Sequence, residues 1–121
     1  MAKRYLDICI QPIPKKHVAQ YTKMTRVIGK LLLKHGALSS RDWVADDENA
    51  MKLSFPKKIK LKAGEVLIFA EAEFKSKAHR EKVFKAMAKD QTFAGMSMEP
   101  SFIDNDRAVV GGFSLLVAVE K

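Results

Sequence analysis

Residues 65–74 read EVLIFAEAEF, and this stretch decides how the rest of the chain is interpreted. Every second residue from Val66 to Phe74 is apolar, which is the alternation of a β-strand with one side buried. The positions in between hold both apolar and acidic side chains, namely Leu67, Phe69, Glu71 and Glu73. Part of this strand is therefore expected to need cover on both faces.

Residues 4–10 predict an earlier strand. Its apolar face carries Leu6, Ile8 and Ile10, and the opposite face carries Tyr5, Asp7, Cys9 and Gln11. This division is typical of a half-buried strand. Proline removes a backbone donor, so the strand is expected to end at Pro12 and Pro14.

A helix and another strand are predicted between these two. From about residue 15 the apolar side chains recur with a period near 3.6, which is typical of an amphipathic helix. Gly36 stands where a left-handed C-cap favours glycine. Residues 38–46 return to extended character around Trp43 and Val44.

A second helix and a last strand complete the pattern. Ser76 can cap a helix that runs to about Lys89, because its side chain can accept a backbone N–H bond. Residues 90–106 show no clear period. Residues 107–119 (RAVVGGFSLLVAV) are apolar on both faces, as in a strand that is covered on two sides.

The predicted order is β-α-β-β-α-β, which indicates an α+β protein of the ferredoxin-like type. We expect one domain over residues 1–121, with a four-stranded antiparallel sheet and two helices on one face. Two helices cover only one face of such a sheet, yet apolar residues occur on both. A second copy of the chain is the simplest cover, so the sequence predicts a homodimer.

Composition excludes several classes of protein. Cys9 is the single cysteine, which rules out an internal disulfide and a multi-cysteine metal centre and favours the cytoplasm. No apolar run approaches the roughly 18 residues of a membrane span, so no membrane partner is expected. The net charge of +8 predicts attraction to polyanions without naming one.

The chain resembles the YbaA-like family of small uncharacterised bacterial proteins over about residues 4–117. The resemblance rests on four short segments, which are Trp43 with Asp46-Asp47, Ser54-Phe55-Pro56, Ser76-Lys77-Ala78-His79-Arg80, and Gly111-Gly112-Phe113. It implies a ferredoxin-like fold that forms a dimeric α+β barrel. It implies no particular activity, because the family has no settled one.

The favoured function is the binding of a small apolar molecule between the sheet and the helices. Aromatic and polar side chains from several elements are candidates to line that pocket, namely Trp43, Asp46, Phe55, Phe69, His79, Arg107 and Phe113. Pockets for small molecules are lined in this way, although core aromatics give the same pattern. A purely structural partner protein remains a further alternative.

One alternative is an enzyme of the cofactor-free oxygenase or isomerase kind, by analogy with other proteins of this barrel architecture. His79 is then the candidate catalytic residue, because the first turn of a helix disfavours the charged imidazole and leaves a neutral donor. No phosphate-binding loop or nucleotide fingerprint occurs, so no cofactor is expected. No metal site is expected either, since no two histidines have the i, i+4 spacing of a helical metal pair.

Another alternative is a module that binds RNA or another polyanion. The predicted first helix places basic residues opposite its apolar stripe, and more follow after residue 56, so the candidate contacts are Lys16, Lys23, Arg26, Lys30, Lys57 and Lys58. Phosphate groups are bound by such rows of cations. A solvated helix face has the same composition and is the simpler interpretation.

Three other features are interpreted as structural. The acidic residues Asp42 and 46–48 are expected to form a solvated turn, because the glycine and spacing of a calcium loop are missing. Cys9 is expected to fill apolar space. Gly111-Gly112 inside a strand is expected to mark a bulge or dimer packing rather than clearance for a ligand.

Overall fold

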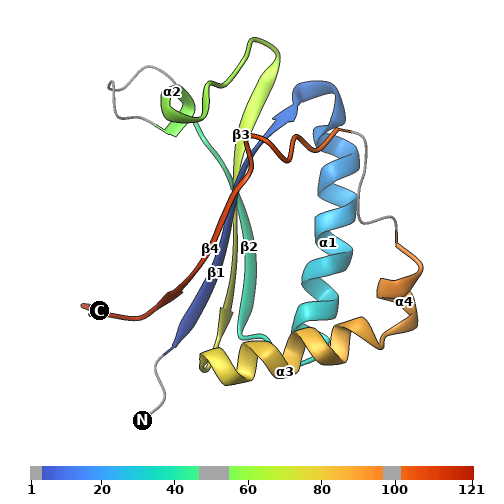
Figure 1. Ribbon diagram of the computed structural model, residues 1–121, viewed down its shortest axis with the longest axis vertical. Helices are drawn as coiled ribbons and strands as arrows, with labels where there is room; N and C mark the ends of the chain where they lie inside the picture. Colours follow the sequence, from blue (N-terminus) through green and yellow to red (C-terminus); the bar gives the residue numbers. More distant parts are fainter. Residues whose placement is uncertain (1–3, 47–54, 97–101) are drawn as a thin grey trace.

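The computed structural model describes residues 4–46, 55–96 and 102–121 of the chain (Figure 1). Strands and helices alternate along it. The elements are β1 (Tyr5–Pro14), the 3-10 helix η1 (Lys15–His17), α1 (Val18–Lys34), β2 (Ser39–Val44), α2 (Phe55–Ile59), β3 (Glu65–Phe74), α3 (Lys77–Ala88), α4 (Gln91–Ala94) and β4 (Val109–Ser114).

The four strands form one antiparallel sheet in the order β2-β3-β1-β4. Helices α1, α3 and α4 lie on one side of this sheet, and the short α2 lies on the other side near one end (Figure 1). The predicted α+β class and four-stranded antiparallel sheet are confirmed. We call the side without α1 and α3 the open face.

The prediction that prolines end the first strand is wrong, because β1 continues through Pro12 to Pro14. The reason lies in its neighbours. β1 pairs with β3 along its whole length, but it pairs with β4 only from Tyr5 to Ile10. Beyond Ile10 one side of β1 has no neighbouring strand, so a proline at every second position removes no ladder bond there.

The alternation in β1 was predicted correctly, but the structure turns its apolar side away from α1 and α3. Tyr5 packs against the core beside α3, and Asp7 forms hydrogen bonds to Arg80 of that helix. Leu6, Ile8 and Ile10 therefore face the open side, since successive side chains point to opposite faces.

The two predicted helix boundaries are confirmed. Gly36 has a φ of +115°, a left-handed conformation that favours glycine, directly after α1. The side chain of Ser76 accepts a hydrogen bond of 3.0 Å from the backbone N–H of His79 and so caps α3. Helices α2 and α4 were not predicted, because elements of five and four residues are too short to show a period.

The core lies between the sheet and helices α1 and α3. Its buried side chains come from both layers and include Leu31, Leu32, Ala72, Phe74, Val83 and Met87. A second cluster at the other end of α1 joins Ile13, Tyr21, Ile68 and Phe102.

The last strand differs from its prediction. It ends at Ser114 rather than near residue 119, although the N–H of Leu115 still donates to the carbonyl of Arg4 at 2.9 Å. All six residues of β4 are exposed in the single chain. The chain's own helices therefore do not supply the two-sided cover that this apolar sequence predicts.

Candidate functional site

A cavity of about 450 Å³ lies between the sheet and helices α1 and α3. Two rows of paired residues from adjacent strands form its floor, Asp42–Ala70–Cys9–Val110 and Ser40–Ala72–Asp7–Gly112. Most of these side chains are small, and the larger Ile28 and Leu32 of α1 stand over them. The space exists because the side chains of the floor are short, whereas the side chains of two packed layers usually interdigitate.

Asp42 forms a polar group at the β2 end of this cavity. Its carboxylate accepts hydrogen bonds from the hydroxyls of Tyr21, at 2.6 Å, and Thr25, at 3.0 Å. Burial raises the pKa of Tyr21, and the hydrogen bond to Asp42 raises it further. Tyr21 therefore remains a donor at neutral pH and holds the carboxylate in place. Within the described parts of the chain, Asp42 forms no salt bridge.

Arg80 forms the second polar group, at the β1 end. Its Nε donates to both carboxylate oxygens of Asp7 at 2.8 and 2.9 Å, and its Nη1 donates to Glu81 at 2.7 Å. The guanidinium also lies 4.4 Å above the ring of Phe84. Burial lowers the pKa of Arg80, but the hydrogen bonds to the two carboxylates outweigh it and raise the pKa. Arg80 is thus a fixed cation beside the cavity.

Cys9 lies on the floor between these two polar groups. Burial raises the pKa of its thiol, and the negative charge of Asp42 raises it further. A thiol that stays protonated is a poor nucleophile. Cys9 is accordingly a small lining residue, in agreement with its structural interpretation.

The seven residues predicted to line the pocket are not brought together, and none of them lines this cavity. Trp43 and Phe69 are paired on the open face, where Trp43 is 55% exposed. Phe113 is also exposed, at the other edge of the same face. Phe55, on α2, is 60% exposed, and Asp46 is an exposed residue just beyond β2.

Arg107 is held in a network of its own. It donates to both carboxylate oxygens of Glu65, at 2.6 and 2.8 Å, and to Asp104 at 2.8 Å. Its hydrogen bond to Glu65 lowers the pKa of that carboxyl. Arg107 therefore links the loop before β4 to the start of β3, which is a structural role.

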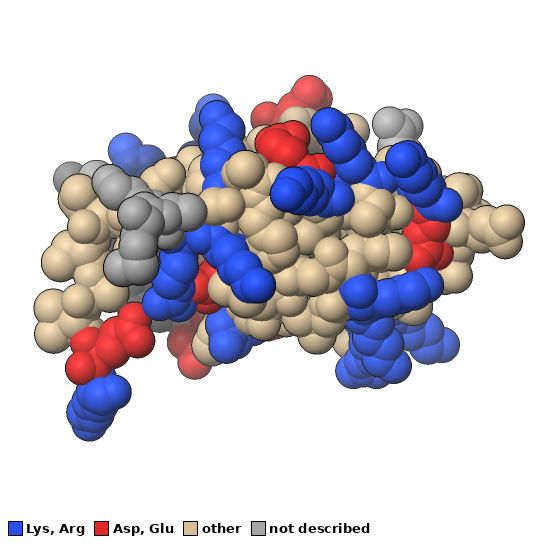
Figure 2. Space-filling model, turned by 90° about the horizontal axis from the view of Figure 1, so that it is seen from below, with Lys and Arg blue, Asp and Glu red and all other residues tan. Residues whose placement is uncertain are grey.

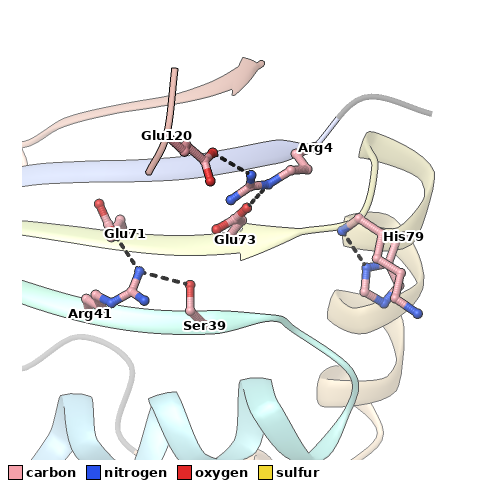
Figure 3. A network of polar contacts seen from close by, with 8 residues as sticks. Arg4, Ser39, Arg41, Glu71, Glu73, His79 and Glu120 are labelled. Atoms are coloured by element: carbon pink, nitrogen blue, oxygen red, sulfur yellow. Dashed lines mark hydrogen bonds and ion pairs between the residues drawn. The ribbon is translucent and has the colours of Figure 1, made fainter. Parts of the chain in front are cut away.

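His79 occupies a structural position at the start of α3. Its Nδ1 accepts a hydrogen bond of 3.0 Å from the backbone N–H of Lys75 (Figure 3). Its ring also packs edge to face against Phe74. A Cβ on Gly36 would lie only 3.2 Å from its Nε2. The imidazole thus packs between the two layers rather than in the cavity.

The six residues predicted to bind a polyanion are all exposed but do not share one face. Lys16, Lys23, Arg26 and Lys30 belong to η1 and α1, whereas Lys57 and Lys58 belong to α2 on the other side of the sheet (Figure 1). Figure 2 shows Lys and Arg in several groups, both along the outline and on the visible face, with other residues between them. The basic residues do not form a single continuous track on that view.

Gly112 has a role that the sequence did not reveal. The pairing of β1 with β4 is regular from Tyr5 to Ile10, so the predicted bulge at Gly111-Gly112 is absent. A Cβ on Gly112 would lie 1.8 Å from the hydroxyl oxygen of Tyr5. Glycine is required here because the tyrosine ring lies across the neighbouring strand.

The described residues contain no candidate metal cluster and no candidate membrane-spanning helix. Among them, no three His, Cys, Asp or Glu side chains come close enough to hold a metal ion. No helix within the described ranges is long and apolar enough to cross a membrane. Asp47 and Glu48 of the predicted acidic turn, and Ser54, lie outside the described residues.

The residues that shape the cavity had only a weak signal in the sequence. Asp7 and Cys9 fall on the polar side of β1, and Ala70 and Ala72 interrupt an otherwise bulky strand. Their meaning depends on the register that pairs them, which follows from the three-dimensional fold. Tyr21 and Thr25 carried no signal that distinguishes them from other residues on a helix, and Arg80 appeared only within the segment 76–80 that supports the family resemblance.

The sheet, its helical cover on one side and the cavity between them define a small α+β domain. The chain belongs to a family described as "Protein of unknown function (DUF1428)", whose model matches residues 4–104. No curated protein matches the chain. The YbaA-like name stays a prediction.

Proposed function

We propose that this chain is a ferredoxin-like domain that acts in the cytosol as a homodimer and binds a small amphipathic molecule between its sheet and helices. The observation that carries the proposal is the cavity of about 450 Å³. Cavities for small ligands commonly measure roughly 300 to 1,000 Å³ and combine apolar walls with a few polar groups. A layer packed for stability alone would have been filled by larger side chains.

The lining indicates the kind of ligand. Ile28, Leu32 and Val110 supply apolar contact for the body of the molecule. Asp42 offers a carboxylate to a hydroxyl or amine, and Arg80 offers a cation that Asp7 already neutralises in part. Adjacent strands lie about 4.8 Å apart, so Asp42 and Asp7, two strands apart, are separated by about 10 Å or more. A ligand that reaches both polar groups has about that length.

The ferredoxin-like assignment is supported by the order of the elements. A strand, α1 and two strands are followed by α3 and a last strand, and β1 lies next to both β3 and β4. Helices α2 and α4 are short additions within the connections. This arrangement corresponds to the split βαβ plan.

The homodimer is supported by the open face. Three apolar residues of β1 share this face with Trp43, Phe69 and Phe113. Leu116, Val117 and Val119 beyond β4 are strongly exposed. Exposed apolar surface on this scale commonly marks an interface.

A second copy is the occupant that the charges favour. Arg4 pairs with Glu73 and Glu120, and Arg41 pairs with Glu71 at 3.2 Å (Figure 3). The charges on this face are therefore balanced within one chain. Two copies, each with a net charge of +8, can therefore pack there without repulsion between the charges of this face.

A catalytic role for the site would depend on Asp42. Proton abstraction requires a base within hydrogen-bond reach of the substrate. Asp42 lines the cavity and forms no salt bridge in the described parts of the chain, whereas Asp7 pairs with Arg80 and Glu71 with Arg41. The RNA alternative has less support, because the basic residues named for it lie on both sides of the sheet.

The test is native mass spectrometry of the protein purified from its own cells. We expect a dimer that carries additional small-molecule mass. Ala70→Phe fills the floor of the cavity and should remove that mass, whereas Val27→Phe, on the outer side of α1, should retain it. Circular dichroism establishes that both variants fold. An empty wild-type dimer, or equal retention by the two variants, would refute ligand binding in this cavity.

A further inference from the structure

A second hollow, of about 560 Å³, lies at the end of the sheet where β1 finishes and β3 begins. We call it the basic hollow, because four lysines from three segments line it, namely Lys15, Lys57, Lys60 and Lys62. The rest of its described lining is Pro56, Leu61, Ala63, Gly64 and Glu65. It shares no lining residue with the cavity between sheet and helices.

The charge of the basic hollow is strongly positive. Glu65 is the one acid among its described lining residues, and Arg107 already binds both of its carboxylate oxygens, at 2.6 and 2.8 Å. None of the four lysines forms a salt bridge with an acid in the parts of the chain that the structure describes. Four like charges held together favour a multiply charged anion.

Backbone hydrogen bonds fix the three segments relative to one another. The N–H of Lys15 donates to Gly64 at 2.8 Å, and the N–H of Leu61 donates to Pro56 at 2.9 Å. The carbonyl of Lys60 accepts from Nη1 of Arg107 at 3.2 Å. The lysines thus project from a preformed support, which reduces the ordering cost of binding.

Lys60 adds an independent observation. Its φ is +61°, and it is the one non-glycine residue with positive φ in the described ranges. Glycine adopts this left-handed conformation without steric cost, whereas a lysine is strained in it. A strained residue in a lined hollow points to a use of its side chain.

We propose that the basic hollow binds a compact polyphosphate group. Lysine ammonium groups are point charges that suit phosphate oxygens from several directions. The described lining contains no aromatic side chain, so it has no platform on which unpaired bases could stack. The hollow therefore fits a short run of phosphates better than a single-stranded nucleic acid. This site is independent of the proposed cavity ligand.

The test measures binding of sodium tripolyphosphate by isothermal titration calorimetry. The variant K57Q/K62Q removes two charges from the basic hollow, and K23Q/K30Q removes two from α1 as a matched control. We expect the Kd to rise by about tenfold or more in the first variant and to stay near the wild-type value in the second. Equal weakening in both, or no binding at millimolar concentration, would overturn the proposal.

Lys60→Gly separates binding from stability. Glycine relieves the left-handed strain, so the Tm should not fall, while the Kd for tripolyphosphate should rise. A lower Tm with unchanged Kd would make Lys60 a structural residue and overturn its role in the site.

A second titration identifies the source of the phosphates. Equal affinity for tripolyphosphate and adenosine triphosphate indicates a site for the phosphates alone, and tighter binding of the nucleotide indicates that the nucleoside also makes contact. Both results support the proposal. Tighter binding of a single-stranded RNA, weakened by K23Q/K30Q, would refute it in favour of a nucleic-acid surface on α1.

Discussion

Replacement of Ile8 by aspartate is the sharpest test of the homodimer. Ile8 lies in the middle of the open face, where β1 pairs it with Glu71 on one side and Gly111 on the other. It is only half buried in the single chain, so the charge remains hydrated in a monomer. In a dimer that packs open face on open face, the same aspartate would be buried.

The expected loss of dimer stability follows from the two-fold symmetry of the interface. Burial of an isoleucine side chain contributes about 1.5 to 3 kcal/mol, and a symmetric interface contains the substituted position twice. Because Ile8 is already half buried in the single chain, about half of this contribution is lost at each of the two positions. The loss is therefore about 1.5 to 3 kcal/mol, which corresponds to roughly a 10- to 10²-fold increase in the dimer Kd. The desolvation of two carboxylates adds to this loss.

Sedimentation velocity over a range of protein concentrations measures the effect. Wild type is expected to be a dimer and Ile8→Asp a folded monomer, while Val27→Asp, at a position 38% exposed on the outer side of α1, should remain a dimer. Trp43 is the single tryptophan and lies on the open face, so its fluorescence should shift to the red as the dimer dissociates. A wild-type monomer, or an Ile8→Asp dimer of unchanged Kd, would refute the open-face interface.

Three further predictions concern stability. Gly112→Ala should destabilise the fold by about 1 to 3 kcal/mol in urea unfolding, because its Cβ overlaps Tyr5. Tyr5→Ala costs stability of its own because Tyr5 packs against the core, but in that background Gly112→Ala should cost much less than in wild type. Additive effects would show that the overlap is not the cause. Ser76→Ala should lower the free energy of unfolding by about 1 kcal/mol, because it removes the cap of α3. The control Ser114→Ala, at an exposed position of β4, should lower it much less. Equal losses would contradict the capping role. Hydrogen bonds from His35 and Lys34 hold the pKa of Asp90 well below its usual range, so this carboxylate stabilises the fold above about pH 4 and loses that effect as the pH falls further. Asp90→Asn should therefore be less stable than wild type at pH 7, with the difference shrinking toward pH 3, and a difference that does not depend on pH would disprove the assignment.

The order of the main elements could be predicted from local patterns. The alternation in residues 65–74 and the period of 3.6 in α1 arise from which side chains are buried, and both are visible in one dimension. The caps at Gly36 and Ser76 follow from properties of the residues themselves, since glycine tolerates a positive φ and a serine side chain can accept a backbone N–H bond. These features need no knowledge of the rest of the chain.

The side of the sheet that meets the helices could not be predicted in the same way. Alternation in β1 separates two faces but does not say which of them packs against α1 and α3. The usual assumption assigns the apolar side to the helices. Here that side faces outward, and Asp7 turns inward because Arg80 of α3 satisfies its charge.

The residues that line the cavity were not predicted, for a related reason. Aromatic residues were chosen because they often line pockets, yet Trp43, Phe69 and Phe113 lie on the open face. The cavity depends on Ala70 and Ala72, which leave space because their side chains are short. Short side chains in a strand leave a cavity only where helices pack above them, so this cavity cannot be recognised before the position of α1 and α3 is known.

The central position of β1 has a consequence for synthesis of the chain. Both neighbours of β1 come much later in the sequence, since β3 begins at Glu65 and β4 at Val109. A ribosome that adds about 5 to 20 residues per second needs about 5 to 20 s to pass from β1 to β4. During that time β1 has unpaired edges that could join another nascent chain. Pro12 and Pro14 remove two donors from that strand, which limits such mispairing while the native partners are still being made.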